Sequence, residues 1–200
     1  YGMEPAMAQV VVDESDKVLG GIHGVMITLK EGMLVANSGV DRSNVSAGSV
    51  ALWPINPFGW AEGTSRRLSA KHGCHVSIIV VDSRVHPLRA GTEGAAISFA
   101  GFVGVRDYRG VPDLYGKPLK ITRLALADEL SCAAHLLMGE AAESIPFVLI
   151  RDAPVTPADT VDKSSVLIPP GECLFMGSIF RRGSRTPRSR RVRTGTAQSE

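Results

Sequence analysis

The strongest constraint on the fold is an apolar run, residues 76–81, that leads directly into Asp82. Only Ser77 interrupts the run, a pattern typical of a strand that is covered on both faces. A carboxylate is not stable uncompensated inside a sheet, so we expect Asp82 at the strand end, facing water, a metal ion or a hydrogen-bond donor. Strand ends are where proteins of the α/β type keep their chemistry.

A second acidic turn, residues 36–44, places Asp41 shortly after another apolar run, residues 33–36. By itself this turn has a purely structural interpretation, in which Asp41 and Asn44 cap backbone N–H groups as in an Asx turn. Asp82 is likewise a weak signal when it is considered alone.

The combination of acidic turns is more informative. With the turn 138–143, which contains Glu140, the chain offers two or three carboxylates and the hydroxyl of Ser83, but no cluster of histidine and cysteine. Such oxygen ligands favour magnesium or manganese over zinc. These ions usually take their remaining ligands from phosphate, so a nucleotide is the natural partner. Arg84 and Arg89 follow closely, and either one is suited to neutralise phosphate or a substrate carboxylate.

The composition, 44% apolar and 21% charged, is that of an ordinary soluble globular protein. With 21 glycines and 12 prolines the chain turns often, which favours short strands over a helical bundle. No apolar run approaches the length of a membrane span, so we expect a cytoplasmic protein that does not bind a membrane. Cys74, Cys132 and Cys173 lie far apart and indicate reduced, partly buried thiols rather than disulfides or a zinc site.

The charge is unevenly distributed. Seven of the 22 basic residues but one of the 20 acidic residues lie in 181–200, so residues 1–180 have 15 basic and 19 acidic residues and a net charge of −4. We expect this Arg-rich tail to be disordered. It contains no aromatic residue that would stack on bases, so a nucleic-acid partner is not expected.

Hydrophobic periodicity predicts an α+β fold with mixed sheets and flanking helices. The most secure helix, 126–137, has an apolar stripe and a stop at Gly139. The hairpin 25–36 has a glycine in its turn. The remaining predictions are helices at 5–19 and 62–72, strands at 94–101 and 147–150, an extended segment at 119–122, and a loop at 107–116.

Several strings of residues, in order, resemble the gamma-glutamyl ligase family of coenzyme F420 biosynthesis. They are 25–28, 36–44, 82–84, 87–92, 113–119, 127–130 and 138–141, and the resemblance extends from about residue 17 to residue 151. The Asp-Ser-Arg and Pro-Leu-Arg strings are similar to those of the archaeal branch. Several strings in register are far more specific than any one of them.

The resemblance implies a gamma-glutamyl ligase-like fold in an intertwined homodimer. It implies a GDP-forming ligase that uses GTP to add L-glutamate by a γ-linkage to F420-0 or F420-1, through an acyl phosphate. Two divalent ions, Mg²⁺ or Mn²⁺, are implied, with K⁺ as a further ion. Asp41 and Asp82 would share the first divalent ion, and Ser83 and Glu140 would hold the second. Asn44 and the loop 138–145 would contact the nucleotide, the loop through Met138, Gly139, Glu140, Ala141, Ala142, Glu143, Ser144 and Ile145.

Family members carry a further N-terminal segment, and we expect this chain, which opens on Tyr1, to start after it. The predicted organisation is therefore an N-terminally incomplete ligase-like domain, 1–180, followed by the tail. Two alternatives remain: a non-catalytic fragment or paralogue that binds a nucleotide, and an RNA-associated protein that acts through the tail.

Overall fold

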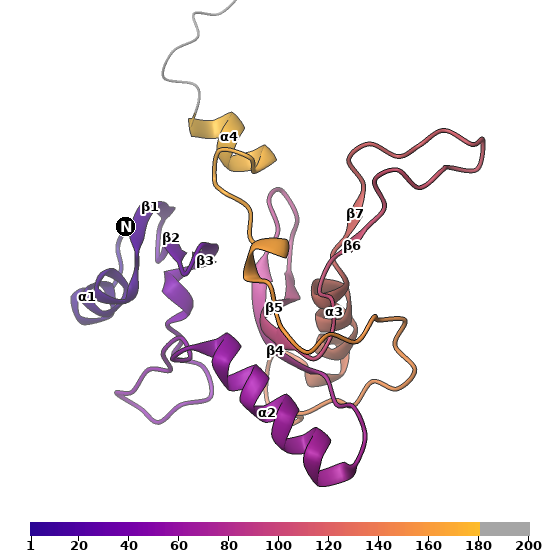
Figure 1. The fold of residues 1–200 in the computed structure, drawn as a ribbon. Coiled ribbons are helices and arrows are strands. Elements are labelled where there is room, and N and C mark those ends of the chain that lie inside the picture. The colour runs from indigo at the N-terminus through magenta and orange to yellow at the C-terminus, as the bar shows by residue number, and fades with distance from the viewer. Residues whose placement is uncertain (181–200) are drawn as a thin grey trace, which may run out of the picture. The chain divides into compact units, whose positions relative to one another are not determined.

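The computed structural model describes residues 1–180, so the predicted tail 181–200 lies outside the described residues. The chain forms two compact units, Tyr1–Leu167 and the part from Ile168 onward. The second unit contains the short helix α4 (Leu174–Phe180). All other helices and strands belong to the first unit, which has the mixed α/β content that the sequence predicts (Figure 1). Within residues 1–180, no helix is long and apolar enough to span a membrane.

The N-terminal part of the first unit is a helix beside a three-stranded antiparallel sheet, in the order β1-β2-β3. Its elements are α1 (Pro5–Glu14), β1 (Lys17–Ile22), β2 (Val25–Lys30), β3 (Met33–Ala36) and the 3-10 turn η1 (Asn37–Gly39). The predicted hairpin is confirmed, and its turn residues Glu31 and Gly32 both have positive φ, as a type I′ turn requires. The predicted helix 5–19 is too long, because the chain beyond Ser15 pairs with β2 as strand β1.

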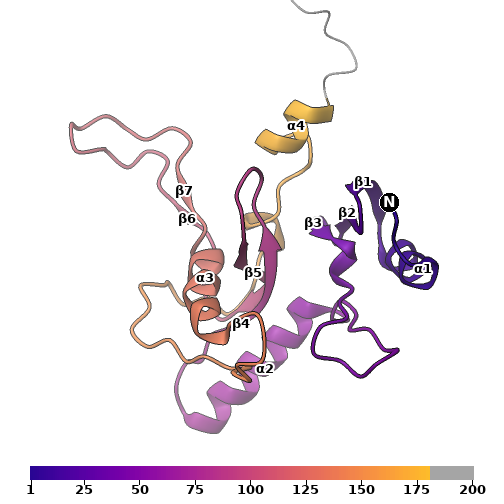
Figure 2. The same cartoon turned by 180° about the vertical axis from the view of Figure 1, so that it is seen from behind.

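The rest of the first unit is built on the antiparallel pair β4 (Ile78–Val85) and β5 (Thr92–Ala100). Helix α2 (Pro57–His72) and helix α3 (Leu126–Met138) both contact this pair (Figures 1 and 2). Two short strands, β6 (Arg106–Asp107) and β7 (Arg123–Leu124), begin and end the long loop before α3, and η2 (Lys163–Ser165) follows α3. Helix α3 confirms the predicted helix almost residue for residue, and its C-cap Gly139 has a φ of 74°. The predicted 62–72 helix is also confirmed, although it begins earlier, after the N-cap Asn56.

Each part of the first unit has its own hydrophobic cluster. The buried residues of the N-terminal cluster are Met7, Val11, Met26 and Val40. Those of the second cluster, beside β5, are Phe58, Phe99, Phe102, Leu126 and Ala127. The predicted site residues Asp41, which follows Val40 of the first cluster, and Asp82, in strand β4, therefore belong to two separately packed parts.

Strand β4 differs from its prediction. Asp82 lies inside the strand rather than at its end, because pairing with β5 continues three residues further, to Val85. Residues 78–83 are half-buried, so the expectation of full cover on both faces is wrong for this chain. Among the described residues β4 pairs only with β5, which leaves its other edge open and explains how a carboxylate is tolerated within the strand.

Two further expectations need correction. Residues 147–150 form no strand, and Phe147 is 84% exposed, because an apolar run needs a pairing partner as well as composition. Residues 119–122 pair with 108–111 through backbone hydrogen bonds, with bends at 120 and 121, and the regular ladder begins at Arg123. Cys132 and Cys173 are half-buried free thiols as expected, whereas Cys74 is exposed.

Candidate functional site

A strained turn positions Asp41. Asn37, Ser38 and Gly39 all have φ between 52° and 70°, a region that residues other than glycine adopt only when their surroundings enforce it. Here hydrogen bonds enforce it: the Asn37 side-chain oxygen accepts from the Met26 N–H at 2.8 Å, and the Ser38 N–H donates to the Thr28 hydroxyl at 2.9 Å. At Gly39 a Cβ would also lie 2.4 Å from the Trp53 ring, so no other residue fits.

The segment 41–44 after this turn forms the Asx turn that its sequence predicts, and it also contacts the predicted nucleotide loop. Asp41 Oδ1 accepts hydrogen bonds from the Ser43 N–H at 2.9 Å and the Ser43 hydroxyl at 2.8 Å, which confirms the Asx turn. Asn44 does not cap this turn. Instead, its Nδ2 donates to the carbonyl of Ala141 at 3.1 Å. The structure therefore brings the 41–44 turn against the 138–145 loop, as a shared nucleotide site would require.

The loop 138–145 begins at the C-terminus of α3. Its carboxylate Glu143 folds back and accepts hydrogen bonds from its own N–H and from the Ala141 N–H, the latter at 2.8 Å, and these bonds lower its pKa. A Cβ on Gly139 would lie 2.2 Å from the Glu143 side chain, so the glycine permits this tight turn. The backbone N–H groups of the loop thus already face a carboxylate oxygen.

The carboxylate of Asp82 has a raised pKa. Burial raises its pKa above the ordinary 3.8, the nearby charges of Asp41 and Glu140 raise it further, and the Ser83 N–H, which donates to Oδ1 at 2.8 Å, lowers it. The charges of Asp41 and Glu140 are therefore both close enough to Asp82 to repel it. A cation placed among them would relieve this repulsion.

Neighbouring residues 82 and 83 point to opposite faces of the strand. Ser83 pairs with Gly94, and a Cβ on Gly94 would lie 2.6 Å from the Ser131 carbonyl of α3, so the Ser83–Gly94 pair faces that helix. Asp82 pairs with Ala95 and faces the other way. A β-bulge between Val80 and Val81 bends the strand just before this point.

Glu140 lies on the α3 side of the strand pair. Its Oε1 accepts a hydrogen bond from the Thr92 hydroxyl and lies 3.0 Å from Nε2 of His135. Gly94 makes this possible, because its missing side chain lets the last turn of α3 approach β5 so closely that a Cβ would lie 2.7 Å from the His135 Cβ. Sequence reasoning assigned no role to Thr92 or His135. The only signal available was their spacing, with Thr92 in a matched string and His135 five residues before Glu140.

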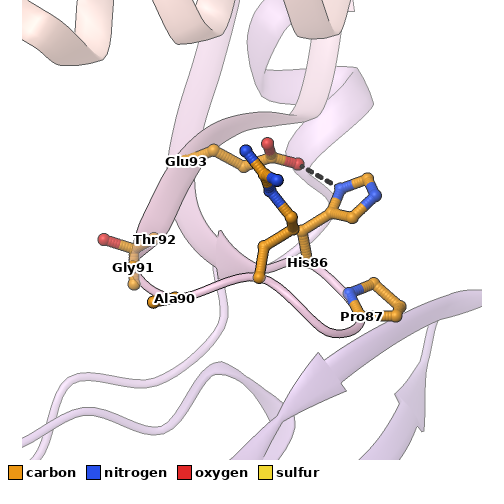
Figure 3. Close-up of a pocket in the computed structure, with 7 residues that line it drawn as sticks. His86, Pro87, Ala90, Gly91, Thr92 and Glu93 are labelled. Carbon is orange, nitrogen blue, oxygen red and sulfur yellow. Dashed lines mark hydrogen bonds and ion pairs between the residues drawn. The ribbon is translucent and has the colours of Figure 1, made fainter.

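The loop between β4 and β5 encloses an open hollow of about 400 Å³ (Figure 3). On its rim Glu93 accepts from His86 Nδ1 at 3.1 Å and from Arg84 Nε at 3.3 Å, and these two partners lower the pKa of Glu93, with His86 dominant. Arg84 also lies 3.9 Å from Asp128. Of the two predicted cations, Arg84 is thus neutralised by its neighbours, whereas Arg89 lines the hollow, exposed, with no ion pair inside residues 1–180.

The donor chemistry at this site fits a hard divalent cation better than zinc. Its ligand atoms are carboxylate and hydroxyl oxygens, and burial, together with the charges of Asp41 and Glu140, raises the pKa of Asp82. Within residues 1–180, no three His, Cys, Asp or Glu side chains converge tightly enough to hold one ion by themselves. Two protein ligands for each ion suit magnesium, which normally completes its shell with water and substrate phosphate.

Comparison with known proteins places these residues in context. Residues 1–152 match the family described as F420-0:Gamma-glutamyl ligase. A protein of Methanococcus maripaludis named coenzyme F420:L-glutamate ligase is 39% identical over 82% of this chain and 66% of its own length. A protein of the same name from Methanocaldococcus jannaschii is 39% identical over 77% of this chain and 62% of its own length. Another, from Archaeoglobus fulgidus, is 37% identical over 75% of this chain and 60% of its own length. The chain thus spans 60–66% of the length of these curated relatives.

Proposed function

Because the chain belongs to the F420-0:gamma-glutamyl ligase family, we propose that it uses GTP to add L-glutamate, through a γ-linkage, to the deazaflavin F420-0 or F420-1. The observation that carries the proposal is the hydrogen bond from Asn44 to the Ala141 carbonyl, which joins the turn of Asp41 to the loop of Glu140. Burial and the charges of Asp41 and Glu140 raise the pKa of Asp82, and perturbed carboxylates of this kind are characteristic of functional sites.

The proposed reaction has two steps. The acceptor carboxylate attacks the γ-phosphorus of GTP, so that an acyl phosphate forms and GDP leaves. The amine of L-glutamate then attacks the acyl carbon, the C–N bond forms, the C–O bond to phosphate breaks, and the nitrogen loses a proton. Both steps bring several anions together, so the site must supply positive charge and alignment.

We propose that Asp41 and Asp82 hold one divalent ion, Mg²⁺ or Mn²⁺, and that Ser83 and Glu140 hold the second. The opposite orientation of Asp82 and Ser83 on strand β4 supports this division, because Ser83 faces the same helix that carries Glu140. When bound, such ions neutralise phosphate charge and align the phosphoryl group for transfer.

The nucleotide is proposed to contact Asn44 and the loop 138–145. The hydrogen bond between Asn44 and Ala141 supports a single site built from both segments. Backbone N–H groups of this loop are suited to bind an anion, and in this structure they donate to the Glu143 carboxylate. A phosphate of the nucleotide would therefore compete with Glu143 for them. A homodimer, with K⁺ as an additional ion, completes the proposal, and exposed Phe147 and Leu149 are apolar surface that a partner would cover.

Arg89 is the proposed contact to a substrate carboxylate, because it alone of the two nearby arginines is free of an ion pair within residues 1–180. Arg89→Ala is expected to raise the KM for L-glutamate or for the acceptor about 10-fold or more, since a hydrogen bond to a charged group contributes about 1.5–3 kcal/mol. Arg89→Lys retains the charge but loses the bidentate geometry, so its KM should lie between those of the original protein and Arg89→Ala. Unchanged KM values for both substrates in Arg89→Ala would contradict this role.

The test of the function follows the mass of the acceptor. Purified protein is incubated with GTP, Mn²⁺, L-glutamate and F420-0, and a gain of one or more glutamyl units with GDP release is expected. Omission of GTP or of the metal should abolish the gain. A folded protein that binds GTP but never modifies the acceptor would instead support the alternative of a non-catalytic, nucleotide-binding member of the family.

A further inference from the structure

The Glu140 carboxylate is held on one side only. Its Oε1 accepts a hydrogen bond from the Thr92 hydroxyl and lies 3.0 Å from Nε2 of the His135 imidazole, whereas Oε2 has no hydrogen-bond partner among residues 1–180. One oxygen is thereby fixed and the other is left as a ligand atom.

Rigid elements carry both partners of Glu140. Thr92 is the first residue of β5, and His135 lies in the last turn of α3 with its side chain only 15% exposed. The close approach of the two elements at Gly94 fixes their spacing. By contrast, Glu140 itself is in a loop, half-exposed, and its position depends on these contacts.

We propose that Thr92 and His135 are positioning residues that orient Glu140 as a ligand of the second divalent ion, the one shared with Ser83. This inference rests on the proposed function. Ser83, Gly94 and Thr92 occupy the same face of the β4–β5 pair, since Ser83 pairs with Gly94 and Thr92 lies two residues from Gly94. Hydrogen bonds of this kind fix the orientation of a ligating carboxylate and commonly change metal affinity 10- to 100-fold.

Thr92 provides the sharpest test, because Thr92→Val removes the hydroxyl with almost no change in shape, while Thr92→Ser retains it. Mn²⁺ binding is followed by the electron paramagnetic resonance signal of the free ion, without nucleotide and without turnover. We expect two Mn²⁺ sites in the original protein. In Thr92→Val one of them should weaken about 10- to 100-fold while the other is unchanged, and Thr92→Ser should bind as the original does.

His135 gives an independent comparison. His135→Ala should weaken the same single site, whereas His135→Gln, whose amide can donate to Glu140, should restore part of the affinity. Ser164→Ala is the matched control, because it removes a hydroxyl that donates to the carboxylate of Asp162 at 2.6 Å in an exposed turn. It should leave both Mn²⁺ sites unaltered.

The outcomes separate the inference from the function on which it rests. Two intact Mn²⁺ sites in Thr92→Val and His135→Ala would overturn the positioning role and leave the proposed metal sites standing. Equal weakening of both sites, with a lowered melting temperature, would also overturn it, since it would show a general structural role. If the original protein binds no Mn²⁺, the metal assignment itself fails, and the inference fails with it.

Discussion

The two aspartates of the candidate site depend on two different kinds of core. Asp41 follows a turn that is fixed by buried hydrogen bonds, in which the fully buried Thr28 and Ser38 bond to each other and to nearby backbone. Asp82 lies on a strand pair held by aromatic packing, with Phe99 5.9 Å from Phe58 and 5.2 Å from Phe102 between ring centroids. Hydrogen bonds specify one geometry, whereas apolar packing supplies most of the stabilising energy.

The difference between the two cores follows from what each aspartate requires of its surroundings. A strained turn of three positive-φ residues is not self-supporting, so its polar contacts must be specific. A strand with an embedded carboxylate needs a strong neighbour to offset the cost, and the Phe cluster beside β5 provides it. Substitutions in the two regions should therefore differ in kind as well as in size.

The largest effect on activity is expected from substitutions of Asp41 and Asp82 themselves. Asp41→Asn and Asp82→Asn should each lower the rate of glutamylation at least about 100-fold, since even indirect supports of metal ligands contribute 10- to 100-fold. Only Asp82→Asn should also stabilise the metal-free protein at pH 7. Burial, with the charges of Asp41 and Glu140, raises the pKa of Asp82, so its ionised form destabilises the folded state.

The pH dependence follows from this raised pKa. The destabilisation by Asp82 is complete above its folded pKa, declines as the pH falls through that value, and is absent below 3.8, where both states are protonated. Melting temperatures of the metal-free proteins between pH 3 and 7.5 measure it. The advantage of Asp82→Asn should therefore shrink on acidification. A lower melting temperature for Asp82→Asn at pH 7 would contradict the electrostatic account.

The aromatic core should show the largest loss of stability. Phe99→Ala is expected to lower the free energy of unfolding by about 3–5 kcal/mol, because Phe99 is 2% exposed and contacts two other rings. Phe147→Ala is the matched control and should change it by less than about 0.5 kcal/mol, since Phe147 is exposed. Chemical denaturation measures both. A large cost for Phe147→Ala would mean that a second chain covers residues 147–150.

Substitutions among the buried hydrogen-bonded residues Thr28 and Ser38 should reduce stability less, but they should also affect the candidate site. Thr28→Val is expected to cost about 1–3 kcal/mol, because the Ser38 N–H loses its acceptor while remaining buried. It should also reduce activity by displacing the turn that positions Asp41. Thr28→Ser retains the hydroxyl and should preserve activity. If Thr28→Val kept full activity while losing stability, the turn would not be what positions Asp41.

These two regions also differ in how far the sequence predicts them. The hairpin 25–36 and helix α3 are predicted well, because glycine turns and an apolar stripe are local signals. The extent of β4 past Asp82 is not local, since it depends on pairing with the stretch that begins at Thr92. Residues 147–150 have a strand-like composition, but they lack a partner strand among the described residues.

The candidate site is likewise hard to predict from sequence where it depends on contacts between distant segments. The acidic turns single out Asp41, Asp82 and Glu140, but only family resemblance assigns them to shared ions, and no spacing rule indicates that they meet. Thr92 and His135 were missed because their role depends on the close approach of α3 and β5 at Gly94. A glycine inside a strand is a weak signal by itself, although it often marks such an approach.

The smallest effect is expected from ion pairs at the surface of the two regions. Glu14 pairs with Lys30 at 3.0 Å, with side chains 29% and 16% exposed, and this pair joins α1 to β2. Glu14→Gln should cost about 0.5–1 kcal/mol at low salt and less at high salt. Asp107→Asn, which breaks the more exposed pair with Arg109, should not measurably change the melting temperature. Equal costs for the two variants would show that burial does not distinguish these pairs, and that the N-terminal part relies on its buried hydrogen bonds alone.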